Sequence, residues 1–83
     1  MEKNSKYLEC PESVRGGLKR YIENKIEPGS FLFAVLSNDL FGAMGKADLG
    51  NRMNLFNIVN WIYNNAPCSC HGSKDIVVNW LNE

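Results

Sequence analysis

The three cysteines and the single histidine are the side chains of this 83-residue chain best suited to nucleophilic or metal chemistry. Two of the cysteines precede the histidine directly in the run Cys68-Ser69-Cys70-His71. Structural zinc usually takes two separated ligand pairs, and only Cys10 is left to complete such a set. No nucleophile with an orienting acid is placed around His71 by the sequence. We interpret these residues as free thiols and a polar loop histidine, and expect no metal, no cofactor and no catalytic residue.

Two Gly-Ser pairs, Gly29-Ser30 and Gly72-Ser73, stand where helices are expected to begin. The first N–H groups of a helix have no partner within the helix and favour anions such as phosphate. A small hydroxyl beside them can add a hydrogen bond. We therefore expect an anion at one of these helix starts, with His71 beside the second.

A third candidate site is a polar helix face on which Trp61 stands among Asn57, Asn60 and Asn64. An outward indole between amides offers a flat apolar surface with hydrogen-bond donors and acceptors, as in a binding hot spot or a base-stacking platform. The alternative is that an A/T-rich coding sequence multiplies Asn without functional meaning and that the last helix covers Trp61. The sequence leaves both interpretations open.

Charge and motif content exclude several classes of function. Nine basic residues balance nine acidic ones, whereas proteins that bind DNA or RNA usually carry a basic excess. The longest apolar run, residues 31–36, is too short to span a bilayer. The odd cysteine count and the absence of a secretion signal indicate reduced thiols. With no P-loop, Rossmann or zinc-protease motif, we expect a cytoplasmic protein that is not an enzyme and binds neither nucleic acid nor membranes.

The spacing of apolar residues predicts an all-α fold, a small bundle of about four helices. The predicted helices cover residues 11–24, residues 30–46, residues 49–65, with Asp48 as N-cap, and a last segment capped by Ser73. We expect one helical domain over residues 11–83 after a flexible N-terminus over residues 1–10, with little structure in residues 1–9. A chain of this size buries only about 60% of its unfolded surface, which favours self-association.

Helical periodicity also predicts the inward side of each helix. The expected core residues are Val14, Leu18, Tyr21 and Ile22; Leu32, Phe33, Val35, Leu36, Leu40, Ala43, Met44 and Ala47; Leu55, Phe56, Ile58, Val59, Ile62 and Tyr63; and Ile76, Val77, Trp80 and Leu81. On the second helix Phe31, Ala34 and Phe41 point away from the core. We expect Phe31 and Phe41 to form the self-association interface.

Asp39 falls on the predicted inward side of the second helix. A carboxylate there needs a partner, because its desolvation costs several kcal/mol. It can cap a neighbouring helix start or pair with Arg15, Arg52 or Lys46, and the functional alternative is a buried acid in a pocket. We expect a buried pair of Asp39 with Arg52, which lies at the edge of the third helix.

Residues 17–80 resemble a family of small, mostly uncharacterised accessory proteins of tailed phages and prophages. The shared residues are Pro28-Gly29-Ser30-Phe31-Leu32, Ala34-Val35-Leu36-Ser37-Asn38-Asp39-Leu40, Ala47-Asp48, Trp61-x-Tyr63-Asn64, Ala66-Pro67 and Gly72-Ser73. The resemblance implies viral origin and a location in the cytoplasm of the infected bacterial host. It supplies no catalytic residues.

Small phage accessory proteins often counter host defences by masking a protein or by sequestering a nucleotide messenger. Our first hypothesis is a non-catalytic binding protein that sequesters a small anionic ligand, such as a cyclic nucleotide. Its expected contacts are the two Gly-Ser helix starts and the Trp61 face. The alternative is an inhibitor that docks on a host protein through Trp61, the Asn residues and Phe41.

Overall fold

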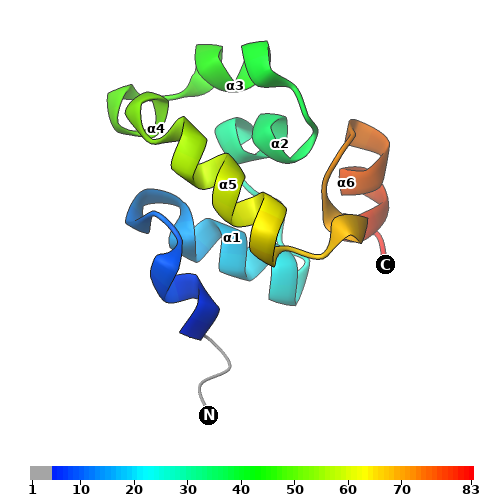
Figure 1. The fold of residues 1–83 in the computed structure, drawn as a ribbon. Helices are drawn as coiled ribbons and strands as arrows, with labels where there is room; N and C mark the ends of the chain where they lie inside the picture. Colours follow the sequence, from blue (N-terminus) through cyan, green and yellow to red (C-terminus); the bar gives the residue numbers. More distant parts are fainter. Residues whose placement is uncertain (1–4) are drawn as a thin grey trace.

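Six α-helices and two short 3-10 helices make up residues 5–83, the part of the chain that this computed structural model describes (Figure 1). In chain order they are η1 Ser5–Glu9, α1 Glu12–Asn24, α2 Ser30–Leu36, α3 Leu40–Lys46, α4 Leu49–Met53, α5 Leu55–Asn65, η2 Cys68–Cys70 and α6 Lys74–Leu81. No strand occurs among these residues, so the predicted all-α class is confirmed. The expected number of helices was too low, because two predicted helices are each divided.

α1 closely matches its prediction. The four residues predicted to face inward are all buried: Val14, Leu18, Tyr21 and Ile22. The helix ends at Lys25, whose φ of 57° is left-handed. The Lys25 N–H donates to the carbonyl of Tyr21, and the Ile26 N–H donates to the carbonyl of Arg20. Leu18 and Tyr21 have no exposed surface, so α1 lies at the centre of the core.

The predicted helix over residues 30–46 is wrong as a single helix, because a turn separates α2 from α3. Asn38 takes a left-handed φ of 65°, which Asn adopts more readily than most residues. Asp39 then caps α3, since its carboxylate accepts a hydrogen bond of 3.0 Å from the backbone N–H of Gly42. A Cβ at Gly42 would collide with that carboxylate, so the glycine leaves room for the cap. The result is that α3 lies over α2 (Figure 1).

This turn changes which side chains reach the core. Phe31 and Ala34, predicted to point outward, are buried, whereas Leu40 and Met44, predicted to point inward, are exposed. Phe41 is 88% exposed, as predicted. Phe31 is therefore a core residue, and the predicted interface of Phe31 with Phe41 is wrong.

The predicted helix over residues 49–65 is also divided, at Asn54. Asp48 caps α4 as predicted, accepting a hydrogen bond of 2.8 Å from the N–H of Asn51. Asn54 ends α4 and begins α5 with φ −101° and ψ 7°, outside the ordinary helical region. Its N–H still donates to the carbonyl of Gly50, so the chain is kinked rather than unwound. The kink changes the direction of the chain between α4 and α5.

α5 buries a different side from the predicted one. Ile58 and Ile62 are in the core as expected. Trp61, predicted to point outward, is only 3% exposed, whereas Phe56 and Tyr63, predicted to point inward, are 78% and 79% exposed. The outward placement of Trp61 is therefore wrong.

The cause is η1, which occupies part of the segment that we expected to have little structure, residues 1–9. The first four residues lie outside the described part of the chain. Tyr7 is buried, with its ring centroid 5.3 Å from that of Trp61. The Trp61 Nε1–H donates to the carbonyl of Lys6 at 2.9 Å. The N-terminal 3-10 helix, and not the last helix, therefore covers the indole.

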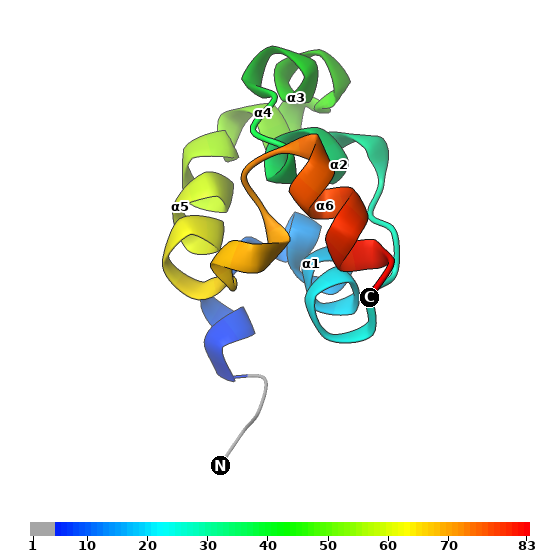
Figure 2. The ribbon, with the colours of Figure 1, turned by 90° about the vertical axis from the view of Figure 1, so that its right-hand side faces the viewer.

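α6 completes the core beside α1 and α2 (Figure 2). Ser73 caps it as predicted, because its hydroxyl accepts a hydrogen bond of 3.2 Å from the N–H of Ile76. Val77 is buried, and the Trp80 Nε1–H donates to the carbonyl of Tyr21 at 3.0 Å. The other predicted inward residues are half-buried: Ile76, Trp80 and Leu81. The C-terminal helix is thereby hydrogen-bonded to α1.

Candidate functional site

A cavity of about 550 Å³, here called the lysine cavity, lies where α2, α3 and the start of α6 meet. It is lined by Glu27, Pro28, Ser30, Phe33, Ala34, Ser37, Asp39, Lys46 and Lys74. Pockets for small ligands typically measure about 300 to 1,000 Å³. This cavity therefore has room for a molecule the size of a nucleotide.

Opposite charges surround the lysine cavity without pairing directly. The charged lining residues are Glu27, Asp39, Lys46 and Lys74. The one ion pair found in residues 5–83 joins Lys25 to Glu83 at 3.0 Å, away from this cavity. The Asp39 carboxylate is occupied as the cap of α3. Both ammonium groups of the cavity are therefore available to an anion.

Apolar and hydroxyl groups complete the lining. Phe33 is half-buried and Ala34 buried. The Ser37 Oγ is inaccessible to solvent and has no hydrogen-bond partner among the described residues. Such a buried hydroxyl costs about 1 to 3 kcal/mol. Ser30 is exposed at the start of α2, where Gly29 offers no side chain as a cap.

At the second Gly-Ser pair, Gly72-Ser73, the groups expected to bind an anion form hydrogen bonds within the protein instead. The Gly72 N–H donates to the carbonyl of Leu36 at 2.8 Å, and the Ser73 hydroxyl is engaged as the cap of α6. Gly72 and His71 line a separate cavity of about 190 Å³. Only the next residue, Lys74, reaches the lysine cavity. The two predicted anion sites therefore do not form one site.

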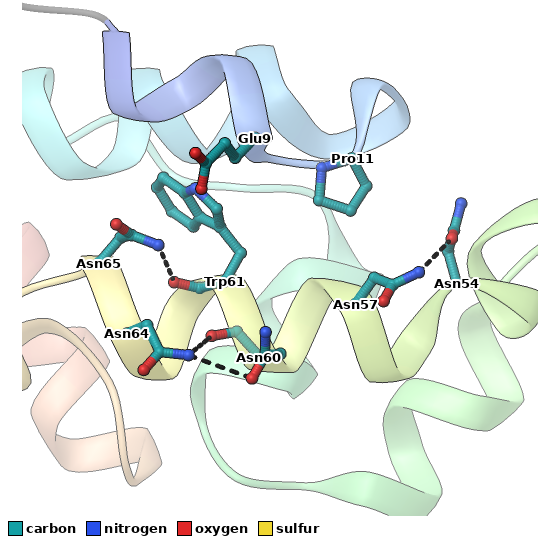
Figure 3. Close-up of a pocket in the computed structure, with 8 residues that line it drawn as sticks. All are labelled: Glu9, Pro11, Asn54, Asn57, Asn60, Trp61, Asn64 and Asn65. Atoms are coloured by element: carbon teal, nitrogen blue, oxygen red, sulfur yellow. Dashed lines mark hydrogen bonds between the residues drawn. The ribbon is translucent and has the colours of Figure 1, made fainter.

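The predicted Asn residues line a groove of about 520 Å³ along α5, here called the amide groove (Figure 3). Its lining residues are Glu9, Pro11, Asn54, Asn57, Asn60, Trp61, Asn64 and Asn65. The Asn57 Nδ2 donates to the Asn54 Oδ1 at 3.1 Å, and the Asn64 Nδ2 donates to the Asn60 carbonyl at 2.8 Å. The amides therefore partly satisfy one another along the helix.

The amide groove is not the stacking platform that the sequence suggested. Figure 3 shows the Trp61 indole directed from α5 toward Glu9, and its N–H is engaged by the carbonyl of Lys6. The buried ring offers no open face to a base. The only charged lining residue is Glu9, which disfavours an anion.

Asp39 and Arg52 do not form the predicted buried pair. Both side chains are exposed, and none of the charged side chains in residues 5–83 is buried. Asp39 caps α3, whereas the Arg52 Nη2 donates to the carbonyl of Ala47 at 3.4 Å. The turn before α3 moves Asp39 to the surface, so the carboxylate no longer needs a buried partner.

The cysteines and the histidine do not form a reactive cluster. Cys10 and Cys70 are buried, and burial raises the pKa of each thiol to about 11. A thiol with so high a pKa stays protonated and is a poor nucleophile at neutral pH. Cys68 is exposed. In residues 5–83 no three His, Cys, Asp or Glu side chains are grouped so that they could hold a metal ion.

Comparisons of this chain with protein-family models, with curated proteins and with solved structures gave no match. Within the described residues, no helix has both the length and the apolar composition needed to cross a bilayer. Interpretation of the site therefore depends on its own chemistry.

Of the first Gly-Ser pair, Ser30 lines the lysine cavity and Gly29 does not, and sequence reasoning missed Phe33, Lys46 and Lys74. A continuous helix over residues 30–46 hid the side of α3 that carries Lys46. The position of Lys74 directly after the predicted cap was the one available signal.

Proposed function

We propose that this protein is a non-catalytic binding protein that holds a small anionic ligand in the lysine cavity. The supporting observation is that Lys46 and Lys74, neither of them in an ion pair within residues 5–83, line one cavity together with the exposed Ser30. Ammonium groups bind phosphate oxygens strongly, and hydroxyls add hydrogen bonds. The ligand's negative charge lies between the two lysines.

A cyclic nucleotide suits this lining better than a highly charged nucleotide. Each phosphodiester carries one negative charge, so a cyclic dinucleotide can place one phosphate against each lysine, while Glu27 and Asp39 keep the lining neutral overall. A triphosphate would bring more charge close to Glu27 and Asp39, which disfavour it. Phe33 offers an apolar surface to a base, and Glu27 can accept hydrogen bonds from amino or hydroxyl groups.

The resemblance to small phage proteins extends this proposal to a biological role. A binding protein made in an infected bacterium would withdraw a nucleotide messenger from the host and so counter its defence. Binding is stoichiometric in this role, and one protein neutralises one or a few messenger molecules. We propose the cytoplasm of the infected cell as its location.

The alternative is an inhibitor that docks on a host protein through the Trp61 face. The position of Trp61 in the structure weighs against it. Trp61 is buried, and an interface hot spot needs an accessible aromatic side chain. The exposed amides and Phe41 remain, but neither indicates a particular protein partner.

Isothermal titration with cyclic mono-, di- and trinucleotides, and with inorganic phosphate, tests the proposal. We expect heat from at least one cyclic nucleotide. Lys46→Gln and Lys74→Gln should each weaken binding about tenfold or more, because each removes a charge-assisted hydrogen bond. Lys19→Gln is the matched control, since Lys19 lies on α1 outside the cavity.

Two results would overturn the ligand proposal. One is the absence of heat from every nucleotide with the folded wild-type protein. The other is a double variant, Lys46→Gln with Lys74→Gln, that keeps its helical circular dichroism and binds as tightly as the wild type.

A further inference from the structure

Exposed apolar side chains accumulate on α3, α4 and α5. Six of them are more than half exposed and are here called the apolar face: Leu40, Phe41, Leu49, Met53, Phe56 and Tyr63. Four have exposed fractions between 78% and 88%. Isolated exposed apolar residues are ordinary, but an accumulation of this kind marks an interaction surface.

The exposed sides of α3 and α5 adjoin each other. Phe56, Val59 and Tyr63 recur at spacings of three and four residues, so they share one side of α5. Val59 lines a cavity of about 180 Å³ together with Leu40 of α3, and one of about 190 Å³ together with Tyr63. In Figure 1, α3 and α4 close the upper end of the molecule above α5. Leu40, Phe56 and Tyr63 therefore adjoin one another, with Val59 between them.

The size of the apolar face matches a stable protein interface. At about 200 Å² for a fully exposed large side chain, its six residues expose roughly 900 Å². The largest apolar patch of a typical monomer measures about 300 to 600 Å², and a stable complex buries about 800 Å² on each partner. We infer that the apolar face is the contact surface between two copies of this chain.

The charge pattern favours a second copy over a different protein. Between residues 49 and 65 the one charged side chain is Arg52, and its guanidinium is directed to the carbonyl of Ala47. Interfaces between different proteins use complementary charges to select the partner. The charges that border the rest of the face are Asp39 beside Leu40 and Asp48 beside Leu49, opposite in sign to Arg52. Opposite charges can face each other across a two-fold axis, so a second copy meets this face without net repulsion. The second copy also supplies the burial that a chain of this size lacks.

The dimer leaves the lysine cavity open. On α3, Lys46 lines that cavity, whereas Leu40 lines the cavity shared with Val59. Ala43, which lies midway between them in the sequence, points into the core. At 3.6 residues per turn, the side chains of Leu40 and Lys46 therefore project to opposite sides of Ala43. One side of α3 therefore serves the ligand site and the other side serves the interface, so the inference does not depend on the proposed ligand.

Sedimentation velocity of the full-length chain, from about 1 to 200 µM in reducing buffer, tests the inference. The reducing agent prevents exposed Cys68 from forming a disulfide between chains. We expect a wild-type dimer. Phe56→Glu should raise its dissociation constant by about 100-fold or more, because a carboxylate would be buried without a partner.

Leu8→Glu is the matched control, because Leu8 is 71% exposed on η1, outside the apolar face, and its variant should sediment like the wild type. Circular dichroism checks that each variant folds, and Tyr63→Lys replaces Phe56→Glu if that variant unfolds. A monomeric wild type at every concentration would overturn the inference, as would a dimer unchanged in both folded variants of the face. A monomer that captures a different protein only when Phe56 is present would reassign the face to that partner.

Discussion

α1 and α5 both contribute to the centre of the core, yet they present different chemistry to solvent. The exposed charged residues of α1 are Glu12, Arg20 and Glu23. α5 has no charged residue, and its exposed surface consists of amides on one side and of Phe56 and Tyr63 on the other. The solvent-exposed side of α1 is charged, as is usual for a surface helix, whereas the solvent-exposed side of α5 includes large apolar side chains. The inferred dimer would cover these apolar side chains of α5 and leave α1 in contact with solvent.

The buried sides of the two helices also depend on different neighbours. The 3-10 helices attach to both: the Lys6 carbonyl in η1 accepts from Trp61 of α5, and the Cys70 carbonyl in η2 accepts from the Tyr21 hydroxyl of α1 at 2.7 Å. Trp61 is covered because the N-terminal segment folds onto it. Short irregular segments therefore determine which side of α5 the protein buries.

The largest change in unfolding free energy is expected from a comparison of alanine substitutions at two aromatic residues of α5. Trp61→Ala should lower the free energy of unfolding by about 3 to 5 kcal/mol, because it empties a buried site. Tyr63→Ala should change it by less than about 0.5 kcal/mol, because Tyr63 is exposed. Urea denaturation followed by circular dichroism measures both. Making the two substitutions in the Phe56→Glu background keeps dimerisation out of the comparison.

Equal effects of these two substitutions would contradict the buried side assigned to α5. A large effect of Tyr63→Ala alone would restore the inward stripe that periodicity predicts. Trp80 remains in both variants as an internal fluorescence reporter of folding.

The sequence predictions were correct where the contact that determines a side chain's position is close in the sequence, and wrong where that contact is far away in the sequence. The caps Asp48 and Ser73 were predicted correctly because a cap binds an N–H only three residues away. The core side of α1 follows from a narrow apolar stripe between charged residues. Trp61 was misplaced because its cover comes from Lys6 and Tyr7, more than 50 positions earlier in the chain. Apolar residues surround so much of α5 that periodicity alone could not select the buried side.

The candidate site shows the same limit. Ser30 was predicted from a local helix start, whereas Lys46 and Lys74 share a cavity only because α3 lies over α2. That arrangement depends on the turn at Asn38 and Asp39. The residue types favour a turn there, but the helical spacing of apolar residues continues through both positions and predicted an unbroken helix. Sequence reasoning could recover such a turn by giving an Asn-Asp pair before glycine more weight than periodicity.

A second, smaller effect concerns Cys70, which holds η2 against the core. Burial raises its pKa from 9.0 to about 11, so as pH rises the unfolded chain loses the thiol proton first. The unfolded state then binds fewer protons, and stability falls between about pH 9 and 11. The full loss from this thiol is about 2 to 3 kcal/mol. Denaturant titrations at several pH values measure it.

Two variants isolate the Cys70 contribution to this pH dependence. Cys70→Ala should remove the part of the fall in unfolding free energy between about pH 9 and 11 that comes from this thiol. This holds whether or not the substitution changes stability at neutral pH. Cys68→Ser, at the exposed cysteine two positions earlier, is the comparison variant that keeps the buried thiol. If Cys70→Ala retained the full wild-type slope, the thiol would not be buried in the folded protein in solution.

The smallest effect distinguishes two buried tyrosines that differ in their hydrogen bonds. The Tyr21 hydroxyl donates to the Cys70 carbonyl, so Tyr21→Phe should cost about 1 to 2 kcal/mol. The Tyr7 hydroxyl has no hydrogen-bond partner among the described residues. Burial, with the nearby Glu23 carboxylate, raises its pKa to about 12. Tyr7→Phe removes an unpaired buried hydroxyl and should leave stability unchanged or raise it by about 1 kcal/mol.

The opposite signs of these two matched substitutions test how η1 and η2 are attached. η2 is joined to α1 by a hydrogen bond from a side chain, whereas the Tyr7 contact of η1 with Trp61 depends on ring packing alone. Urea denaturation of both variants gives the two free energies directly. A loss of stability in Tyr7→Phe equal to that in Tyr21→Phe would mean that the Tyr7 hydroxyl has a partner in solution. Glu23 is the first candidate, because its charge already acts on that hydroxyl, and Glu23→Gln in the Tyr7→Phe background would then be without further effect.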